Sequence, residues 1–210
     1  MQTSPDVAGP SADEALARLI EGNQRFLRGE ARSAAFRRDT LADLALAQRP
    51  YATILGCSDS RVPPEWIFDT GLGELFVVRV AGNVLLPEVA GSLQYAGSYL
   101  QTPLFVVLGH EGCGAVSAAL ATVHEGEQFR SRVQLLLASI VPGLPAFDPQ
   151  ATPDERLSRA VESNVRWTVR QILDSPEGQA RVVEGRVRIV GAVYEIETGS
   201  VRFLPPDDRT

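Results

Sequence analysis

The chain has 210 residues, of which 44% are apolar and 22% are charged; these values are typical of one globular domain with a sizeable core. The formal net charge of −6 argues against a protein that binds nucleic acid electrostatically, so we expect no nucleic-acid partner. No apolar stretch approaches the roughly 20 residues that cross a bilayer, so we expect no membrane partner either.

The N-terminal region predicts a tail followed by a helix. Residues 1–11 are rich in Ser, Pro, Gly and Asp, and we expect a disordered tail there and a single domain over residues 12–210. The tail lacks the basic and apolar regions of a signal peptide, which favours a cytoplasmic location. Ser11 and Glu14 form a capping-box pattern, and apolar residues then recur at helical spacing as far as Leu27. Such a helix could cover its own core or lie on a partner subunit.

Two short apolar runs are followed by side chains that bind metals. The runs at 52–56 and 104–109 carry no charge, which is typical of buried strands in a parallel sheet. A second helical stretch, over 32–49, precedes the first run. Open α/β sheets place their sites in loops at the carboxyl ends of such strands, so the side chains after the two runs could converge if the strands are neighbours. These side chains are Cys57, Asp59, His110 and Cys113.

The residue types and their spacing indicate zinc. Two thiolates, an imidazole and a carboxylate suit zinc better than calcium or magnesium. His110 and Cys113 are three positions apart, where a turn into a helix can direct both at one ion, and an extended segment directs Cys57 and Asp59 the same way. Arg61 can form a forked pair of hydrogen bonds with Asp59, which would hold this carboxylate beside the metal. A disulfide between the two cysteines is the alternative, although a cytoplasmic chain keeps its thiols reduced.

The remaining pattern alternates helices and strands. Strands are expected over 74–80, 186–194 and, after a turn, 201–204. Helices are expected after Pro63, where Trp66, Ile67 and Phe68 should turn inward, and over 87–101, 115–125, 129–141 and 156–173. The sequence therefore predicts an α/β fold with a central, mainly parallel sheet, an antiparallel C-terminal edge strand and flanking helices.

Two segments resemble the signatures of the β-class carbonic anhydrases. They are Cys57-Ser58-Asp59-Ser60-Arg61-Val62 and Gly109-His110-Glu111-Gly112-Cys113-Gly114-Ala115. The likeness extends roughly over residues 15–204 and includes the stretches at 79–83 and 191–194. It implies one zinc ion per chain, bound by Cys57, His110 and Cys113, with Asp59 as a fourth ligand in a closed state. It also implies an N-terminal helix that packs on a partner subunit, and a homodimer or tetramer.

The resemblance further implies reversible hydration of carbon dioxide to bicarbonate and a proton, by attack of zinc-bound hydroxide. Asp59, paired with Arg61, would accept a hydrogen bond from this hydroxide, and both would be catalytic. The family's substrate-binding positions fall on Gln48, Phe76, Ala81 and Tyr95. Ile54 stands where members with a non-catalytic bicarbonate pocket carry Trp. We therefore expect this pocket to be absent and Asp59 to be free of zinc near and above neutral pH.

Other functions remain open at this point. An enzyme that acts on carbonyl sulfide or carbon disulfide on the same scaffold would use the same ligands. A non-catalytic protein stabilised by zinc could close the fourth position with Asp59, although the forked partner Arg61 argues against this. Redox chemistry of the two thiolates would lack a resolving cysteine close in sequence.

Overall fold

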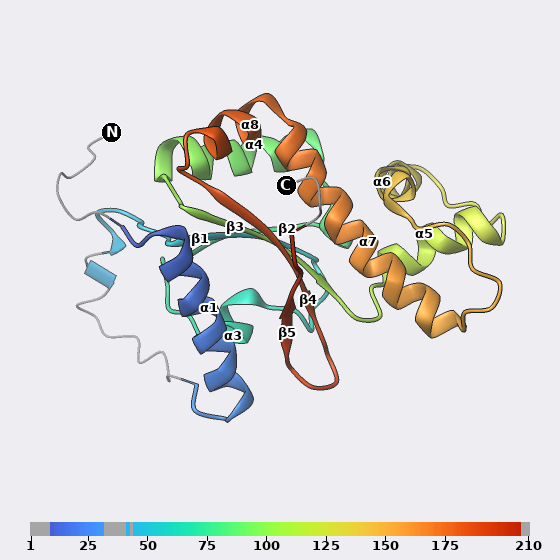
Figure 1. Ribbon diagram of the computed structural model, residues 1–210, viewed down its shortest axis with the longest axis horizontal. Helices are drawn as coiled ribbons and strands as arrows, with labels where there is room; N and C mark the ends of the chain where they lie inside the picture. The colour runs from blue at the N-terminus through green and yellow to red at the C-terminus, as the bar shows by residue number, and fades with distance from the viewer. Residues whose placement is uncertain (1–8, 32–40, 43, 207–210) are drawn as a thin grey trace.

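A five-stranded sheet in the order β2-β1-β3-β4-β5 forms the centre of the molecule (Figure 1). The computed structural model describes residues 9–31, 41–42 and 44–206. The first four strands are parallel, and the last pairs antiparallel with its neighbour. Their bounds are β1 (Ala52–Gly56), β2 (Leu75–Arg79), β3 (Leu104–His110), β4 (Arg188–Tyr194) and β5 (Val201–Phe203). The predicted fold class is confirmed.

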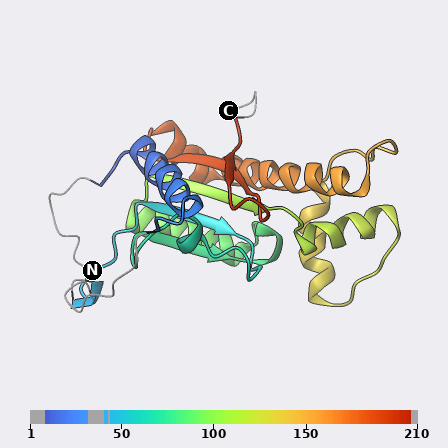
Figure 2. The same cartoon turned by 90° about the horizontal axis from the view of Figure 1, so that it is seen from below.

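Helices cover both faces of this sheet (Figures 1 and 2). One face carries α1 (Ala12–Leu27) and α3 (Pro64–Ile67). The other face carries α4 (Pro87–Tyr95), the π-helical turn η2 (Ala96–Leu100), α7 (Pro153–Asp174) and α8 (Pro176–Val183). Beyond the carboxyl end of β3 lie α5 (Gly114–His124), α6 (Arg132–Ile140) and the 3-10 turn η3 (Val141–Gly143). The short 3-10 turn η1 (Ala81–Asn83) follows β2.

The central strands are apolar throughout because both of their faces are buried. Successive side chains of a strand point to opposite faces. Ile54 and Val106 belong to the core cluster under α1 and α3, whereas Leu55 and Val107 belong to the cluster under α4 and α7. All residues of β1 and β3 are buried. This double coverage explains the two uncharged runs of the sequence.

Helix α1 packs on the core of its own chain. Its start is the predicted capping box, in which Ser11 accepts from the backbone N–H of Glu14 and the Glu14 carboxylate accepts from Ser11. Leu19 is fully buried, and the buried Asn23 donates to the carbonyl oxygens of Ile67 and Gly199. The structure thus shows that this helix covers the core of its own chain, which was one of the two arrangements that the sequence left open. Contact between α1 and a partner subunit stays a prediction.

Several local predictions differ from the structure. Ile67 and Phe68 are buried, but Trp66 is 75% exposed, so the prediction that Trp66 turns inward is wrong. Helix α3 is a single turn, and a single turn cannot direct three successive side chains to one side. Helix α8 was not predicted, although Ser175 caps it and Pro176 opens it. Most of the helical stretch predicted at 32–49 and most of the predicted tail lie outside the described residues.

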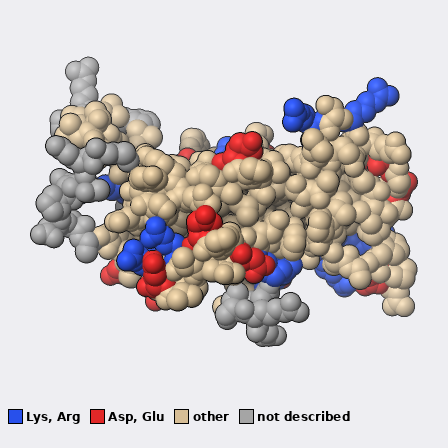
Figure 3. Space-filling model, turned by 90° about the horizontal axis from the view of Figure 1, so that it is seen from above, with Lys and Arg blue, Asp and Glu red and all other residues tan. Residues whose placement is uncertain are grey.

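The surface agrees with the composition. On the face shown in Figure 3, acidic and basic side chains are interspersed, and no basic stripe crosses it. Each helix in the described part of the chain is too short or too polar to cross a bilayer.

The division into a tail and a single domain at residue 12 stays a prediction.

Candidate metal centre

The structure brings Cys57, His110 and Cys113 together at the carboxyl edge of the sheet. Strands β1 and β3 are parallel neighbours with Gly56 level with Leu108, so they end side by side. Cys57 directly follows β1, His110 is the last residue of β3, and Cys113 is the N-cap of α5. Their two sulfurs and a ring nitrogen lie within 4.8 Å of one another, and all three residues are buried. This distance is compatible with ligation of one ion.

The imidazole of His110 presents its Nε2 atom to the two sulfurs. Its Nδ1 atom is 2.9 Å from the carbonyl oxygen of Glu111, which can only accept, so Nδ1 carries the proton. In the neutral imidazole, Nε2 is then the acceptor. It is fully buried and has no hydrogen-bond partner within the described residues. A buried nitrogen without a partner is costly, and a metal ion would satisfy it.

The two cysteines are both free and buried, so the alternative of a disulfide is not found. A hydrogen bond from the Cys113 thiol lowers the pKa of Cys57, more than burial raises it. The same contact with the Cys57 thiolate, together with burial, raises the pKa of Cys113. Metal ligation requires both sulfurs as thiolates, so binding of a dication would release the thiol protons.

Asp59 lies beside this group and is held by Arg61. Arg61 donates from Nε to Oδ1 at 2.9 Å and from Nη2 to Oδ2 at 2.8 Å, which is the predicted forked pair. These hydrogen bonds, with a third from the Arg61 backbone, keep the pKa of Asp59 well below its usual range. The Oδ2 atom is 3.8 Å from Nε2 of His110. The carboxylate is therefore ionised and within reach of a metal at that nitrogen.

Two further residues fix the loop after β1, and the sequence assigned neither of them a role. Arg79, at the end of β2, donates to the carbonyl oxygen of Cys57 at 3.0 Å and to that of Asp59 at 2.6 Å. Gly82 donates its backbone N–H to the sulfur of Cys57 at 3.4 Å. Both residues lie within the segment 79–83, whose likeness to the resembled family was the available signal.

Comparisons with known proteins agree with this geometry. The family model described as carbonic anhydrase matches residues 52–201. Carbonic anhydrase 2 of Mycobacterium tuberculosis is 40% identical over 183 residues, which cover 86% of this chain and 87% of the relative. The solved structure of the β-carbonic anhydrase CcaA superposes with a TM-score of 0.72 at 26% identity, covering 91% of this chain and 99% of that one. The chain belongs to the β-class carbonic anhydrases.

Other solved members of the class share the fold at greater distance. A tetrameric β-carbonic anhydrase from the ascomycete Sordaria macrospora matches with a TM-score of 0.72 at 22% identity, over 91% of this chain and 97% of that one. At this identity the likeness shows the fold alone. Hydration of carbon dioxide is the general reaction of carbonic anhydrases, and this chain is a carbonic anhydrase (carbonate dehydratase) by family. These names do not favour the alternative substrates carbonyl sulfide and carbon disulfide.

The predicted substrate-binding residues of this carbonic anhydrase do not all gather at its own metal centre. Ala81 adjoins Gly82 and is therefore close to Cys57. Phe76 is level with Thr53, four residues before Cys57, which is about 13 Å along a strand. The Tyr95 ring lies 6.1 Å from the Phe76 ring. Gln48 is exposed and precedes β1, whereas Cys57 follows it.

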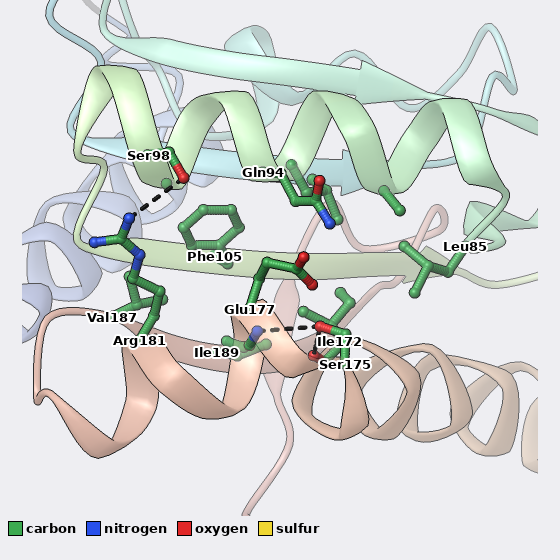
Figure 4. Close-up of a pocket in the computed structure, with 14 residues that line it drawn as sticks. Leu85, Gln94, Ser98, Phe105, Ile172, Ser175, Glu177, Arg181, Val187 and Ile189 are labelled. Carbon is green, nitrogen blue, oxygen red and sulfur yellow. Dashed lines mark hydrogen bonds between the residues drawn. The ribbon is translucent and has the colours of Figure 1, made fainter.

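A separate pocket of about 70 Å³, partly open to solvent, lies between the helices α4 and α8 (Figure 4). Phe105 and Ile189 of the sheet form part of its apolar lining, and Gln94 and Glu177 project into it from the two helices. Arg181 donates to the hydroxyl of Ser98 across one end, at 3.3 Å. None of the residues proposed for the metal centre or the substrate lines this pocket.

Proposed function

We propose that this carbonic anhydrase holds one zinc ion per chain through Cys57, His110 and Cys113 and interconverts carbon dioxide and bicarbonate. The observation that supports this most strongly is the buried, unpartnered Nε2 atom of His110 within 4.8 Å of two sulfurs. Two thiolates and one imidazole are a donor set that zinc prefers. Three protein ligands leave a fourth position open, as catalytic zinc sites do.

The side chains around this fourth position have distinct roles in the proposal. A zinc ion held by Cys57, His110 and Cys113 would supply a nucleophile there, because zinc lowers the pKa of bound water to about 7. Asp59, whose carboxylate lies 3.8 Å from Nε2 of His110, would accept a hydrogen bond from a group at this position and so orient it toward carbon dioxide. Arg61 keeps Asp59 ionised and holds it in this orientation. In a closed state, Asp59 would leave Arg61 and occupy the fourth position itself.

We further propose that the protein is a homodimer, or a tetramer formed from dimers. The outer edge of β2 has no strand partner in the described chain. The ring of Phe76 in this strand contacts Tyr95, which stacks on Tyr99, and the two tyrosines are 38% and 63% exposed. A second copy on this face would bury these rings. It could also bring Phe76, Tyr95 and Gln48 to the partner's metal centre, which their own chain does not do.

Contact of α1 with the partner is part of this proposal. Its inner face packs on its own core, but Ile20 and Leu27 remain 38% and 45% exposed and are available for a second subunit. A cytoplasmic location also belongs to the proposal, because the two cysteines are free thiols and thiols persist in a reducing compartment.

The proposal is tested by metal analysis together with stopped-flow hydration of carbon dioxide between about pH 6.5 and 9, where a water on zinc ionises. We expect about one zinc per chain, loss of activity on treatment with a chelator, and recovery with added zinc. The variant Cys113→Ser should lose most of its zinc and its activity, because a hydroxyl is a poor zinc ligand at neutral pH. An active protein that contains no zinc would refute the proposal, and so would a Cys57–Cys113 disulfide.

A further inference from the structure

Gly82 connects the helix α7 to one of the sulfur ligands. Its backbone N–H donates to the Cys57 sulfur at 3.4 Å, and its carbonyl oxygen accepts from Nδ2 of Asn164 at 2.9 Å. Asn164 lies in the middle of α7, 82 positions further along the chain. Gly82 thus accepts a hydrogen bond from a buried side chain of α7 and donates one to a sulfur that is a candidate metal ligand.

The backbone of Gly82 is in a conformation that needs support. Its φ of 69° and ψ of 19° lie in the left-handed region, which glycine tolerates best. A Cβ atom at this position would come within 2.8 Å of Cδ1 of Ile140 and within 3.2 Å of Cβ of Ala115. Glycine is required there, and glycine is also the most flexible residue of the backbone. A hydrogen bond to its carbonyl therefore restricts the direction in which the neighbouring N–H points.

Asn164 is placed there at a cost to stability. It is only 1% exposed, and its Oδ1 atom has no hydrogen-bond partner in the part of the chain that the structure describes. The neighbours Val161 and Val165 are apolar and pack into the core. A buried amide that leaves one polar atom unsatisfied is costly, whereas an apolar side chain of the same size would not be. Packing alone therefore does not explain an asparagine at this position.

We infer that Asn164 is a positioning residue of the metal centre, which acts through Gly82 on the sulfur of Cys57. The N–H held by this arrangement restrains the sulfur and withdraws electron density from it. Hydrogen bonds to metal-bound sulfurs tune both affinity and electronic properties of a site. The inference rests on the proposed zinc centre and adds to it a contact from helix α7, through the hydrogen bond of Asn164 to Gly82 in η1.

The test compares two substitutions on the same helix. Asn164→Leu removes the donor to Gly82 and keeps a similar volume. Thr168→Val is the matched control, because Thr168 lies one turn further along α7, is also 1% exposed, and its hydroxyl has no partner among the described residues. Zinc affinity is measured by competition with a chromogenic chelator. Cobalt(II) is then substituted for zinc, and the sulfur-to-cobalt charge-transfer band is recorded.

We expect Asn164→Leu to weaken zinc binding about 10-fold or more and to shift the charge-transfer band to lower energy, as the sulfur becomes more electron-rich. Thr168→Val should leave both unchanged. If Asn164→Leu does not fold, Asn164→Ala is measured instead, with the same expectation. An unshifted band with unchanged affinity in the Asn164 variant would overturn the inference, and so would equal effects in the Thr168 variant. Failure of the unsubstituted protein to bind either metal would overturn the zinc centre as well.

Discussion

Arg61 donates one side-chain hydrogen bond to each oxygen of the Asp59 carboxylate, at 2.9 and 2.8 Å. The same carboxylate is 3.8 Å from the unpartnered nitrogen of His110. Asp59 can therefore either stay hydrogen-bonded to Arg61 or ligate a metal bound at Nε2 of His110. Because the Arg61 side chain is 54% exposed, the pair can separate without leaving a buried charge behind.

Replacement of Asp59 by Ala should abolish most of the hydration activity but leave zinc bound. The three ligands remain, whereas the group that orients the nucleophile is lost, and loss of orientation costs about 100-fold or more in rate. Zinc content and stopped-flow rates check this. Asp148→Ala is the control, because Asp148 forms a similar 2.8 Å pair with Arg159 at an exposed site. Loss of zinc together with unfolding in Asp59→Ala would instead favour a non-catalytic protein stabilised by zinc.

Replacement of Arg61 by Leu should reduce stability at neutral pH and less so in acid. Arg61 lowers the pKa of Asp59 in the folded state, so the pair stabilises the fold fully above the ordinary carboxyl pKa of about 3.9. Below this value the unfolded chain binds a proton first, and the stabilisation is lost as the pH falls toward the folded-state pKa. Because the pair is partly exposed, we expect a cost of no more than about 1 kcal/mol at neutral pH.

Urea unfolding of the metal-free proteins, at about pH 7 and about pH 3, measures this difference on either side of the carboxyl pKa. Metal-free samples are needed because zinc binding itself depends on pH. A cost of Arg61→Leu that grows in acid would show that the arginine acts other than through the charge of Asp59.

The elements that frame the centre could be predicted because their signals are local. The two uncharged runs form β1 and β3, which are buried on both faces. Strands covered by helices on both sides are apolar throughout, so such a run predicts a strand of this kind. The helices α1 and α7 begin with capping boxes, at Ser11 and Thr152, that lie within four residues of sequence. The ligand positions follow from these strands, since each ligand comes within three residues of a strand end.

The supporting contacts could not be predicted, because they join ordinary residues across long separations. Arg79 binds the carbonyl of Asp59 across 20 positions, and Asn164 binds that of Gly82 across 82. A hydrogen bond between a side chain and a distant carbonyl leaves no periodicity in the sequence. The resemblance likewise predicted that Phe76 is a substrate-binding residue, but it did not indicate whether Phe76 contributes to the site of its own subunit or of a partner.

Replacement of Tyr99 by Asp should dissociate the proposed dimer. Tyr99 is 63% exposed and stacks on Tyr95, and burial of an unpaired carboxylate among aromatic rings would cost about 2 kcal/mol or more in association. Light scattering after size exclusion reports the mass. Leu135→Asp on α6 is the control, because Leu135 is 61% exposed outside this ring cluster. Unchanged mass in Tyr99→Asp, or equal dissociation in both variants, would contradict the proposed interface.

Regulation by bicarbonate bound near Ile54 is not expected. Ile54 is fully buried in the core cluster that also contains Leu19 of α1 and Ile67 of α3. An anion beside it would lose its hydration and gain no hydrogen bond from this side chain. We therefore expect that crystals grown with bicarbonate at pH about 8, where free carboxyls are fully ionised, show none near Ile54 and show Asp59 still paired with Arg61. Bicarbonate bound next to Ile54, with Asp59 on the zinc, would contradict this and would imply that the closed state forms without a tryptophan at that position.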